Sequence, residues 1–188
     1  KAMRSMGLTP FFQVSHSELV ITCKLNSKQI LFAGLDDPEK IKSTTPIDGV
    51  ITDIWVEEAT EASYEAVKQL AKRLRGRSAV KKRLILSFNP ILQSHWIYRE
   101  YFGGWTDDER FYRDENLLIL KTTYKDNDFL EPDDVAELEN ETDPYYYQVY
   151  TLGNWGVLGN VIFKNWEVQD LSEIRKTFDR FNNGLDFG

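Results

Sequence analysis

The sequence is poor in the residues that build disulfides and metal centres. Cys23 is the only cysteine of the 188 residues, which excludes an intrachain disulfide and a cysteine-based zinc site and fits a reducing compartment. The two histidines, His16 and His95, are far apart in the sequence and have no clustered ligands near them. We therefore expect both histidines to be structural.

Long apolar runs are also missing. No run approaches the roughly 18 residues of a membrane span, and the first residues, KAMRSMGLTPFF, lack the apolar core of a signal peptide. We therefore expect a soluble, cytoplasmic chain with no membrane partner. Because the sequence starts without Met and stops at a strand-like GLDFG, we also expect it to be a segment of a longer protein.

Positive charge is scarce. The chain has 23 Lys and Arg against 30 Asp and Glu, a formal net charge of -7, which argues against a surface that holds nucleic acid by bulk positive potential. The exception is the segment KRLRGRSAVKKR, residues 72–83, with seven basic residues. This segment is either the solvated end of a helix, where cations are favoured, or a local contact for a DNA backbone or an acidic neighbouring subunit.

Strand and helix patterns alternate along the chain. Expected strands cover residues 18–25 and 29–35, joined as a hairpin, then 49–59, 83–87 and 116–127, and expected helices cover 60–75, 95–104 and two short pieces within 132–152. The strand at 49–59 is apolar on both sides near its end, which indicates a buried strand of a parallel sheet. The alternation predicts an α/β domain with helices on both faces of the sheet.

Two adjacent acids, Glu57 and Glu58, lie near the end of this strand, directly after its apolar run, in IWVEEAT. Magnesium is a hard ion that keeps most of its waters, so proteins usually offer it one or two carboxylates and leave the rest of the shell to water and phosphate. One acid can serve the metal while its neighbour orients or activates an attacking water. The alternative is a surface pair at a helix N-terminus, where the macrodipole favours acids.

A second polar group follows the next strand. LILSFNP brings Ser87, Phe88 and Asn89 to the carboxyl end of a strand that should lie beside the first one. Ligands of open α/β sheets bind outside the carboxyl ends of the strands, so Ser87 and Asn89 are candidates to sense a phosphate or a water. Otherwise, SFNP is a strand-ending turn with Asn-Pro as the breaker.

Five segments, in their order and spacing, resemble the large terminase subunit of tailed bacteriophages, an ATP-driven DNA-packaging motor: GLDDPEKIKS, IWVEEAT, LSFNP, TTYKDNDFL and GLDFG. The resemblance implies an α/β fold, with part of a P-loop ATPase domain of the additional-strand type followed by an RNase H-like nuclease. It implies that residues 1–152 are the later part of the ATPase domain, that 153–183 are a linker, and that 184–188 are the first nuclease strand.

The resemblance also implies roles for individual residues. Glu57 would be the magnesium-side acid and Glu58 the catalytic carboxylate of the Walker B strand, and Ser87 and Asn89 would link phosphate state to domain movement. Asp186 matches the first metal-binding aspartate of a nuclease that uses two divalent metal ions. The implied cofactors are ATP and Mg2+. The implied partners are double-stranded DNA, a portal protein, a small terminase subunit and further copies in a homo-oligomeric ring on the procapsid, in the host bacterial cytoplasm.

The sequence departs from the family pattern in its phosphate-binding loop. No GxxxxGK[ST] occurs in it, so this chain alone is expected not to hydrolyse ATP, and the remaining nuclease acids are expected beyond Gly188. Two other functions stay open. One is a helicase-like motor ATPase, which would not need the GLDFG strand, and the other is a catalytically silent nucleotide-binding or assembly module, which the missing loop favours.

Overall fold

The computed structural model describes residues 2–35 and 45–157 of the chain. Contacts divide the chain into Lys1–Val157 and Leu158–Gly188. The second unit lies outside the described residues, and with it most of the expected linker, the expected strand 184–188 and Asp186. None of the described helices is long and apolar enough to cross a membrane.

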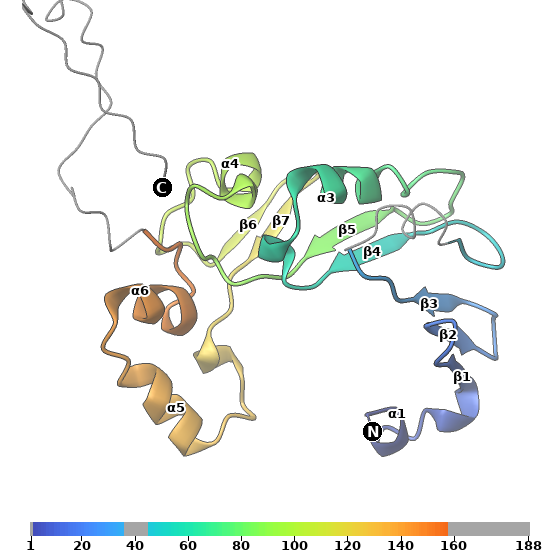
Figure 1. The fold of residues 1–188 in the computed structure, drawn as a ribbon, viewed down its shortest axis with the longest axis horizontal. Coiled ribbons are helices and arrows are strands. Elements are labelled where there is room, and N and C mark those ends of the chain that lie inside the picture. The colour runs from blue at the N-terminus through green and yellow to red at the C-terminus, as the bar shows by residue number, and fades with distance from the viewer. Residues whose placement is uncertain (1, 36–44, 158–188) are drawn as a thin grey trace, which may run out of the picture. The chain divides into compact units, whose positions relative to one another are not determined.

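The N-terminal part forms an antiparallel sheet (Figure 1). Its elements are α1 (Ala2–Ser5), the 3-10 turn η1 (Thr9–Phe11), β1 (Phe12–Ser15), β2 (Val20–Cys23) and β3 (Gln29–Leu31). β2 pairs with both neighbours, and Val20 lies opposite Leu31. The predicted hairpin is therefore confirmed, whereas β1 was not predicted.

A parallel pair of strands follows, joined by a helix. β4 (Asp53–Val56) pairs with β5 (Arg83–Leu86), with Val56 opposite Leu86. The connecting helix α3 (Tyr64–Ala71) begins where the Ser63 hydroxyl accepts a hydrogen bond from the Ala66 N–H at 3.2 Å, as a capping serine does. The helix predicted over 60–75 is therefore present but shorter at both ends.

The remaining elements are short. They are the 3-10 turn η2 (Ala59–Glu61), α4 (Trp96–Tyr101), β6 (Phe111–Arg113), β7 (Leu118–Leu120), the 3-10 turn η3 (Tyr124–Asp126), α5 (Pro132–Glu139), α6 (Pro144–Tyr146) and the π-helix η4 (Tyr147–Thr151). β7 confirms the expected strand, and α5 and α6 confirm the two short helices. β7 pairs antiparallel with β6, which was not predicted.

The core lies on one face of the β4–β5 pair. Val56 is buried, and Ile54 and Leu84 pack against the same cluster, together with Val67 of α3 and Ile97 of α4. Both helices lie on this side of the strands in Figure 1. The sequence predicted helices on both faces, but within residues 45–157 α3 and α4 share one.

The other face of the pair is open in the described part of the chain. Trp55 and Ile85 lie opposite each other in the register and are 68% and 43% exposed. Successive side chains of a strand point to opposite faces, so these two point away from α3 and α4. The apolar Ile-Trp-Val run predicted burial on both faces, but hydrophobicity alone does not say what covers the second one.

The segment after η4 closes the core. Trp155 is 4% exposed and packs against Phe88, with ring centroids 5.6 Å apart. The next residue, Gly156, donates its N–H to Pro90 O at 2.9 Å and accepts the Gln93 N–H at 3.2 Å. This exchange ties the end of the described chain to the segment that follows β5.

Candidate functional site

The acid pair and Ser87 meet at the carboxyl edge of the β4–β5 pair. The Ser87 N–H donates to Val56 O at 3.0 Å, and the Ala59 N–H donates to Ser87 O at 3.0 Å. The ladder therefore continues past both strands and holds the chain on either side of Glu57 and Glu58 against Ser87. The structure confirms the predicted position of these three residues beyond adjacent strand ends.

The backbone of Glu58 is left-handed, with φ 50° and ψ 47°. This conformation costs a residue with a Cβ about 1–2 kcal/mol, and such strain is commonly found at functional sites. The turn sends Ala59 into the core, where its exposed fraction is 0%, while both glutamates remain exposed. The chain thus holds Glu58 in an unfavourable backbone conformation with its side chain open to solvent.

The alternative of an ordinary helix start does not fit this geometry. α3 begins at Tyr64, after its cap at Ser63, and the acid in its first turn is Glu65. Glu57 and Glu58 come before the separate turn η2 and outside the first turn of α3, where the helix macrodipole acts. The helix dipole therefore does not account for the pair.

The start of α4 fixes the turn that follows the acid pair. His95 accepts the Ile97 N–H at Nδ1, so its Nε2 carries the proton and donates to Thr60 O at 3.1 Å. The Trp96 indole N–H donates to Ala62 O at 2.8 Å. These two side chains brace η2, which gives His95 the structural role expected from the sequence.

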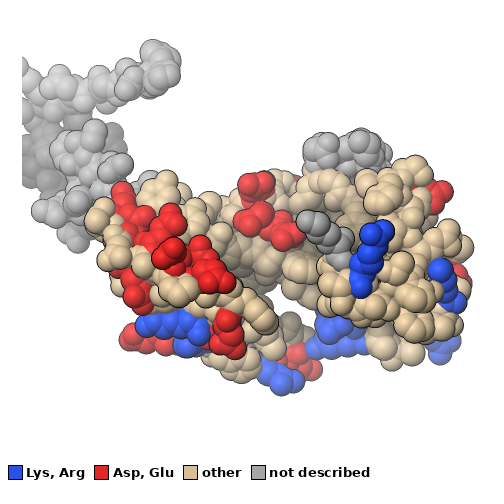
Figure 2. All heavy atoms as spheres, turned by 90° about the horizontal axis from the view of Figure 1, so that it is seen from below, with Lys and Arg blue, Asp and Glu red and all other residues tan. Residues whose placement is uncertain are grey.

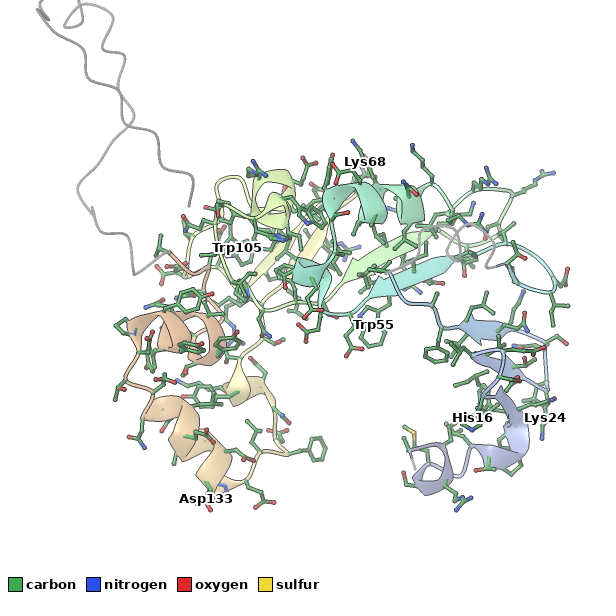
Figure 3. The ribbon with its side chains drawn as sticks, in the orientation of Figure 1. His16, Lys24, Trp55, Lys68, Trp105 and Asp133 are labelled. Atoms are coloured by element: carbon green, nitrogen blue, oxygen red, sulfur yellow. The ribbon has the colours of Figure 1, made fainter. Side chains whose placement is uncertain are left out.

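Ser87 is held by an indole from the open face. The Trp55 Nε1–H donates to the Ser87 Oγ at 2.8 Å, and Figure 3 shows Trp55 extending from β4 on the side away from α3. With this bond made, the Ser87 hydroxyl keeps its own proton to donate and one more lone pair to accept with. Ser87 is therefore oriented and still able to meet a ligand.

The LSFNP segment connects this edge to the end of the described chain. Phe88 packs against Phe102 and Trp155, and Pro90 O accepts the Gly156 N–H. Asn89 between them is exposed. Packed rings and a backbone hydrogen bond therefore connect the residues after Ser87 to Trp155 and Gly156.

The opposite end of the two strands carries an ion pair. Arg83 Nε donates to Asp53 Oδ1 at 2.6 Å, and the Thr52 hydroxyl donates to Asp53 Oδ2 at 2.7 Å. The Thr52 hydrogen bond, and after it Arg83, lowers the pKa of Asp53 below its ordinary value. Both side chains of the pair are largely exposed, so it contributes less than about 1 kcal/mol to stability.

The donor set suits a magnesium ion that arrives with a nucleotide. No group of three or more His, Cys, Asp and Glu side chains that could hold a metal occurs among residues 2–35 and 45–157. A magnesium–nucleotide complex needs only one or two carboxylates, because phosphates and waters complete its shell. Glu57 and Glu58, both exposed, are the candidates for these carboxylates. Asp186, the expected nuclease ligand, lies outside the described residues.

Comparison with known proteins identifies the family. A family profile described as phage terminase large subunit matches residues 1–154. The chain belongs to this family. It is 32% identical over 206 residues to the PBSX phage terminase large subunit of Bacillus subtilis (strain 168), and 25% identical over 200 residues to the large terminase subunit of Bacillus phage SPP1. All of this chain aligns to 46% and 45% of those terminases, so it spans just under half of their length.

Solved terminase structures share the fold. The large terminase from a thermophilic bacteriophage matches with a TM-score of 0.60 and 22% identity, over 82% of this chain and 36% of that one. The same terminase in complex with ATP-gamma-S matches with a TM-score of 0.58 and 22% identity, over 84% of this chain and 36% of that one. These matches confirm the predicted mixed α/β class, with its parallel strand pair, as a large-terminase fold.

Sequence reasoning missed three side chains that shape this terminase site. Trp55 orients Ser87, and His95 and Trp96 brace the turn after Glu58. The place of Trp55, between Ile54 and Val56 and two residues before the acid pair, was a usable signal. His95 and Trp96 lie more than 30 residues from the groups they contact, and no spacing rule connects them.

Proposed function

We propose that this terminase chain is part of a motor that couples ATP hydrolysis to movement of double-stranded DNA into a procapsid. The observation that carries the proposal is the juxtaposition of two exposed carboxylates and an oriented Ser87 at one edge of a parallel strand pair. Ligands of open α/β sheets bind at this edge. The likeness to a terminase in complex with ATP-gamma-S supports a nucleotide there.

Each acid has its own task in this proposal. Glu57 would bind the magnesium ion of the nucleotide complex, and Mg2+, when bound, neutralises charge on the phosphates. Glu58 accepts a hydrogen bond from the attacking water and takes its proton as the γ-phosphate is cleaved. In a longer form of the protein, a phosphate-binding loop would supply the N–H groups and the lysine that hold the phosphates.

Ser87 and Asn89 report the phosphate state in this scheme. The Ser87 hydroxyl can hydrogen-bond to the γ-phosphate or the water, and the exposed Asn89 amide lies two residues further along the same segment. Loss of the phosphate would break the hydrogen bond of the Ser87 hydroxyl and let this segment move. The packing of Phe88 against Trp155 would transmit the movement to the end of the domain. The result would be a stroke on the DNA.

The complete protein would act with several partners in the host bacterial cytoplasm. These are the DNA, a portal protein, a small terminase subunit and other copies in a ring on the procapsid. Its nuclease domain would cut the DNA with two divalent metal ions, one of them bound by Asp186, because paired ions stabilise both the attacking and the leaving oxygen.

A longer form of the protein that includes an upstream phosphate-binding loop tests the proposal. We expect this form to hydrolyse ATP only with magnesium present, because the carboxylates and the loop must both hold the nucleotide complex. The present chain alone should give no turnover above buffer. Release of phosphate, measured for both proteins with and without EDTA, checks this. An inactive longer form would contradict the proposal.

Replacing Ser87 tests the coupling role. In the longer form, Ser87→Ala should leave ATP turnover within a few-fold of the unmodified protein and lower the DNA length moved per ATP by about tenfold, within the usual range of coupling between sites. Translocation in optical tweezers, with phosphate release measured in parallel, gives both quantities. Ser87→Thr should restore the ratio, and the exposed Ser94→Ala should not change it. An unchanged ratio in Ser87→Ala would remove Ser87 from the coupling path.

A silent nucleotide-binding or assembly module is the second candidate. It predicts that the longer form gains no turnover. A helicase-like motor, the remaining alternative, predicts duplex unwinding by the longer form, which a packaging motor does not require.

A further inference from the structure

Basic side chains gather in the connection between α3 and β5, residues 72–83, here called the basic loop. It contains seven of the 23 Lys and Arg of the chain and no acid. Lys81 Nζ donates to Glu115 O at 2.8 Å, and Arg83 pairs with Asp53. Lys72, Arg75 and Arg77 are exposed. These three make the loop a positively charged surface.

Acidic side chains gather in residues 126–143, here called the acidic arm. It contains nine Asp and Glu and no Lys or Arg, and Figure 2 shows acids gathered over the part of the view where α5 and α6 lie. α5 is held from one side, since the Thr151 hydroxyl donates to Leu138 O at 2.8 Å. Asp133 and Glu137 are exposed and one turn apart, so they share a face of α5. Figure 3 labels Asp133 near the start of this helix.

Each charged surface also presents an apolar side chain. Phe129, in the acidic arm, is 93% exposed, and Val80, in the basic loop, is 59% exposed. A protein interface commonly buries an aromatic or aliphatic anchor inside a polar rim. A face that contacts only water leaves the phenyl ring of Phe129 exposed, whereas an interface would bury it. The two segments therefore combine opposite charges with one exposed apolar side chain each.

We infer that the basic loop of one copy binds the acidic arm of a second copy. The two surfaces differ, so the contact is head-to-tail and builds a ring if its rotation closes. Opposite charges on the two surfaces steer the encounter and fix its register. DNA would explain the basic loop but would leave the acidic arm and Phe129 without a function. The biological setting of this contact rests on the proposed function, but its evidence is the charge and exposure of the two segments.

Two charge-inverted variants of the present chain test the contact. The loop variant is Lys72→Glu, Arg75→Glu, Arg77→Glu, and the arm variant is Asp128→Lys, Asp133→Lys, Glu137→Lys. Sedimentation velocity at low ionic strength should show concentration-dependent association of the unmodified chain, weakened by added salt. Each variant alone should associate at least about tenfold more weakly, because its inverted charges lose their opposite-charge partners and repel the native charges of the facing surface.

Mixing the two variants is the decisive step. The inverted loop of one variant then faces the inverted arm of the other, while the native loop and arm of the two chains also match, so association should return. Phe129→Ala should weaken association without any change of charge. The control Arg4→Glu, Lys24→Glu, Lys28→Glu inverts three exposed residues elsewhere and should leave association unchanged, and circular dichroism melts check that every variant is folded.

The inference would be overturned by an unmodified chain that stays monomeric at low salt, by a mixture that fails to associate, or by a loop or arm variant that associates as well as the unmodified chain. Loss of double-stranded DNA retention by the loop variant, with self-association intact, would assign the basic loop to DNA. The experiment measures no ATP turnover, so its failure is separate from a failure of the proposed function.

Discussion

Glu58→Gln should lower ATP turnover of the longer, loop-containing protein by at least about 100-fold, because removal of a general base typically costs 10²–10⁴ in rate. Glutamine keeps the size of the side chain but cannot take a proton from water. Nucleotide binding should change little, since in the proposed mechanism an upstream loop would hold the phosphates and Glu57 would bind the magnesium ion. Phosphate release and the binding of a fluorescent ATP analogue measure the two effects separately.

Two companion variants distinguish catalysis from a local role in the turn. Glu61→Gln makes the same charge change on an exposed residue in η2 and should keep full turnover. Glu58→Gly removes the side chain and the cost of its left-handed backbone. The free energy of unfolding should therefore stay the same or rise by up to about 1 kcal/mol, while turnover falls. If Glu58→Gln retained its rate, the pair would be a charged turn and the ATPase assignment of these acids would be wrong.

Gly156→Ala should destabilise the chain by about 3 kcal/mol, the upper part of the usual range for forcing extra volume into a packed core. A Cβ at this position would lie 2.2 Å from Ile91 O, 2.5 Å from the Tyr145 ring and 2.9 Å from a Val149 methyl group. The first of these atoms is backbone, and its segment is fixed by the Gly156 hydrogen bonds to Pro90 and Gln93. Urea unfolding, followed by far-UV circular dichroism, gives the free energy of unfolding.

Gly103→Ala is the matched control for this change. A Cβ there meets nothing within 4 Å, and the backbone of Gly103 is not left-handed. The free energy of unfolding of this variant should therefore stay within about 0.5 kcal/mol of that of the unmodified chain, as for most surface substitutions. Equal free energies of unfolding for the two variants would mean that the segment after β5 can move away from Gly156. The ring of Trp155 would then be held by packing alone.

The sequence predicted the parts of this fold that depend on local pattern and on chain order. The acid pair and Ser87 could be placed together because carboxyl ends of adjacent parallel strands meet at one edge, and the register confirms this. The packaging family was also recognisable from five short segments, and the family profile confirms it. The roles assigned to Glu57, Glu58, Ser87 and Asn89 stay predictions.

Features set by distant contacts could not be predicted. The helix expected over 60–75 has good helix formers throughout, yet its first residues belong to the separate turn η2 and its C-cap, where His95 and Trp96 donate hydrogen bonds to the carbonyls of Thr60 and Ala62. β6 is three residues long and gains its strand geometry by pairing with β7. The exposure of Trp55 was also hidden, because its strand has the composition of one that is buried on both faces.

The hydrogen bond between Trp55 and Ser87 places a chromophore at the proposed phosphate sensor. Indole emission responds to the polarity around the ring and to the partner of its N–H, and this indole is both solvent-facing and bonded to the hydroxyl in question. The fluorescence of Trp55 therefore reports on Ser87 without an added dye. In the longer form, the change of emission that is lost in a Trp55→Phe variant would therefore follow nucleotide binding, hydrolysis and phosphate release in stopped-flow time courses.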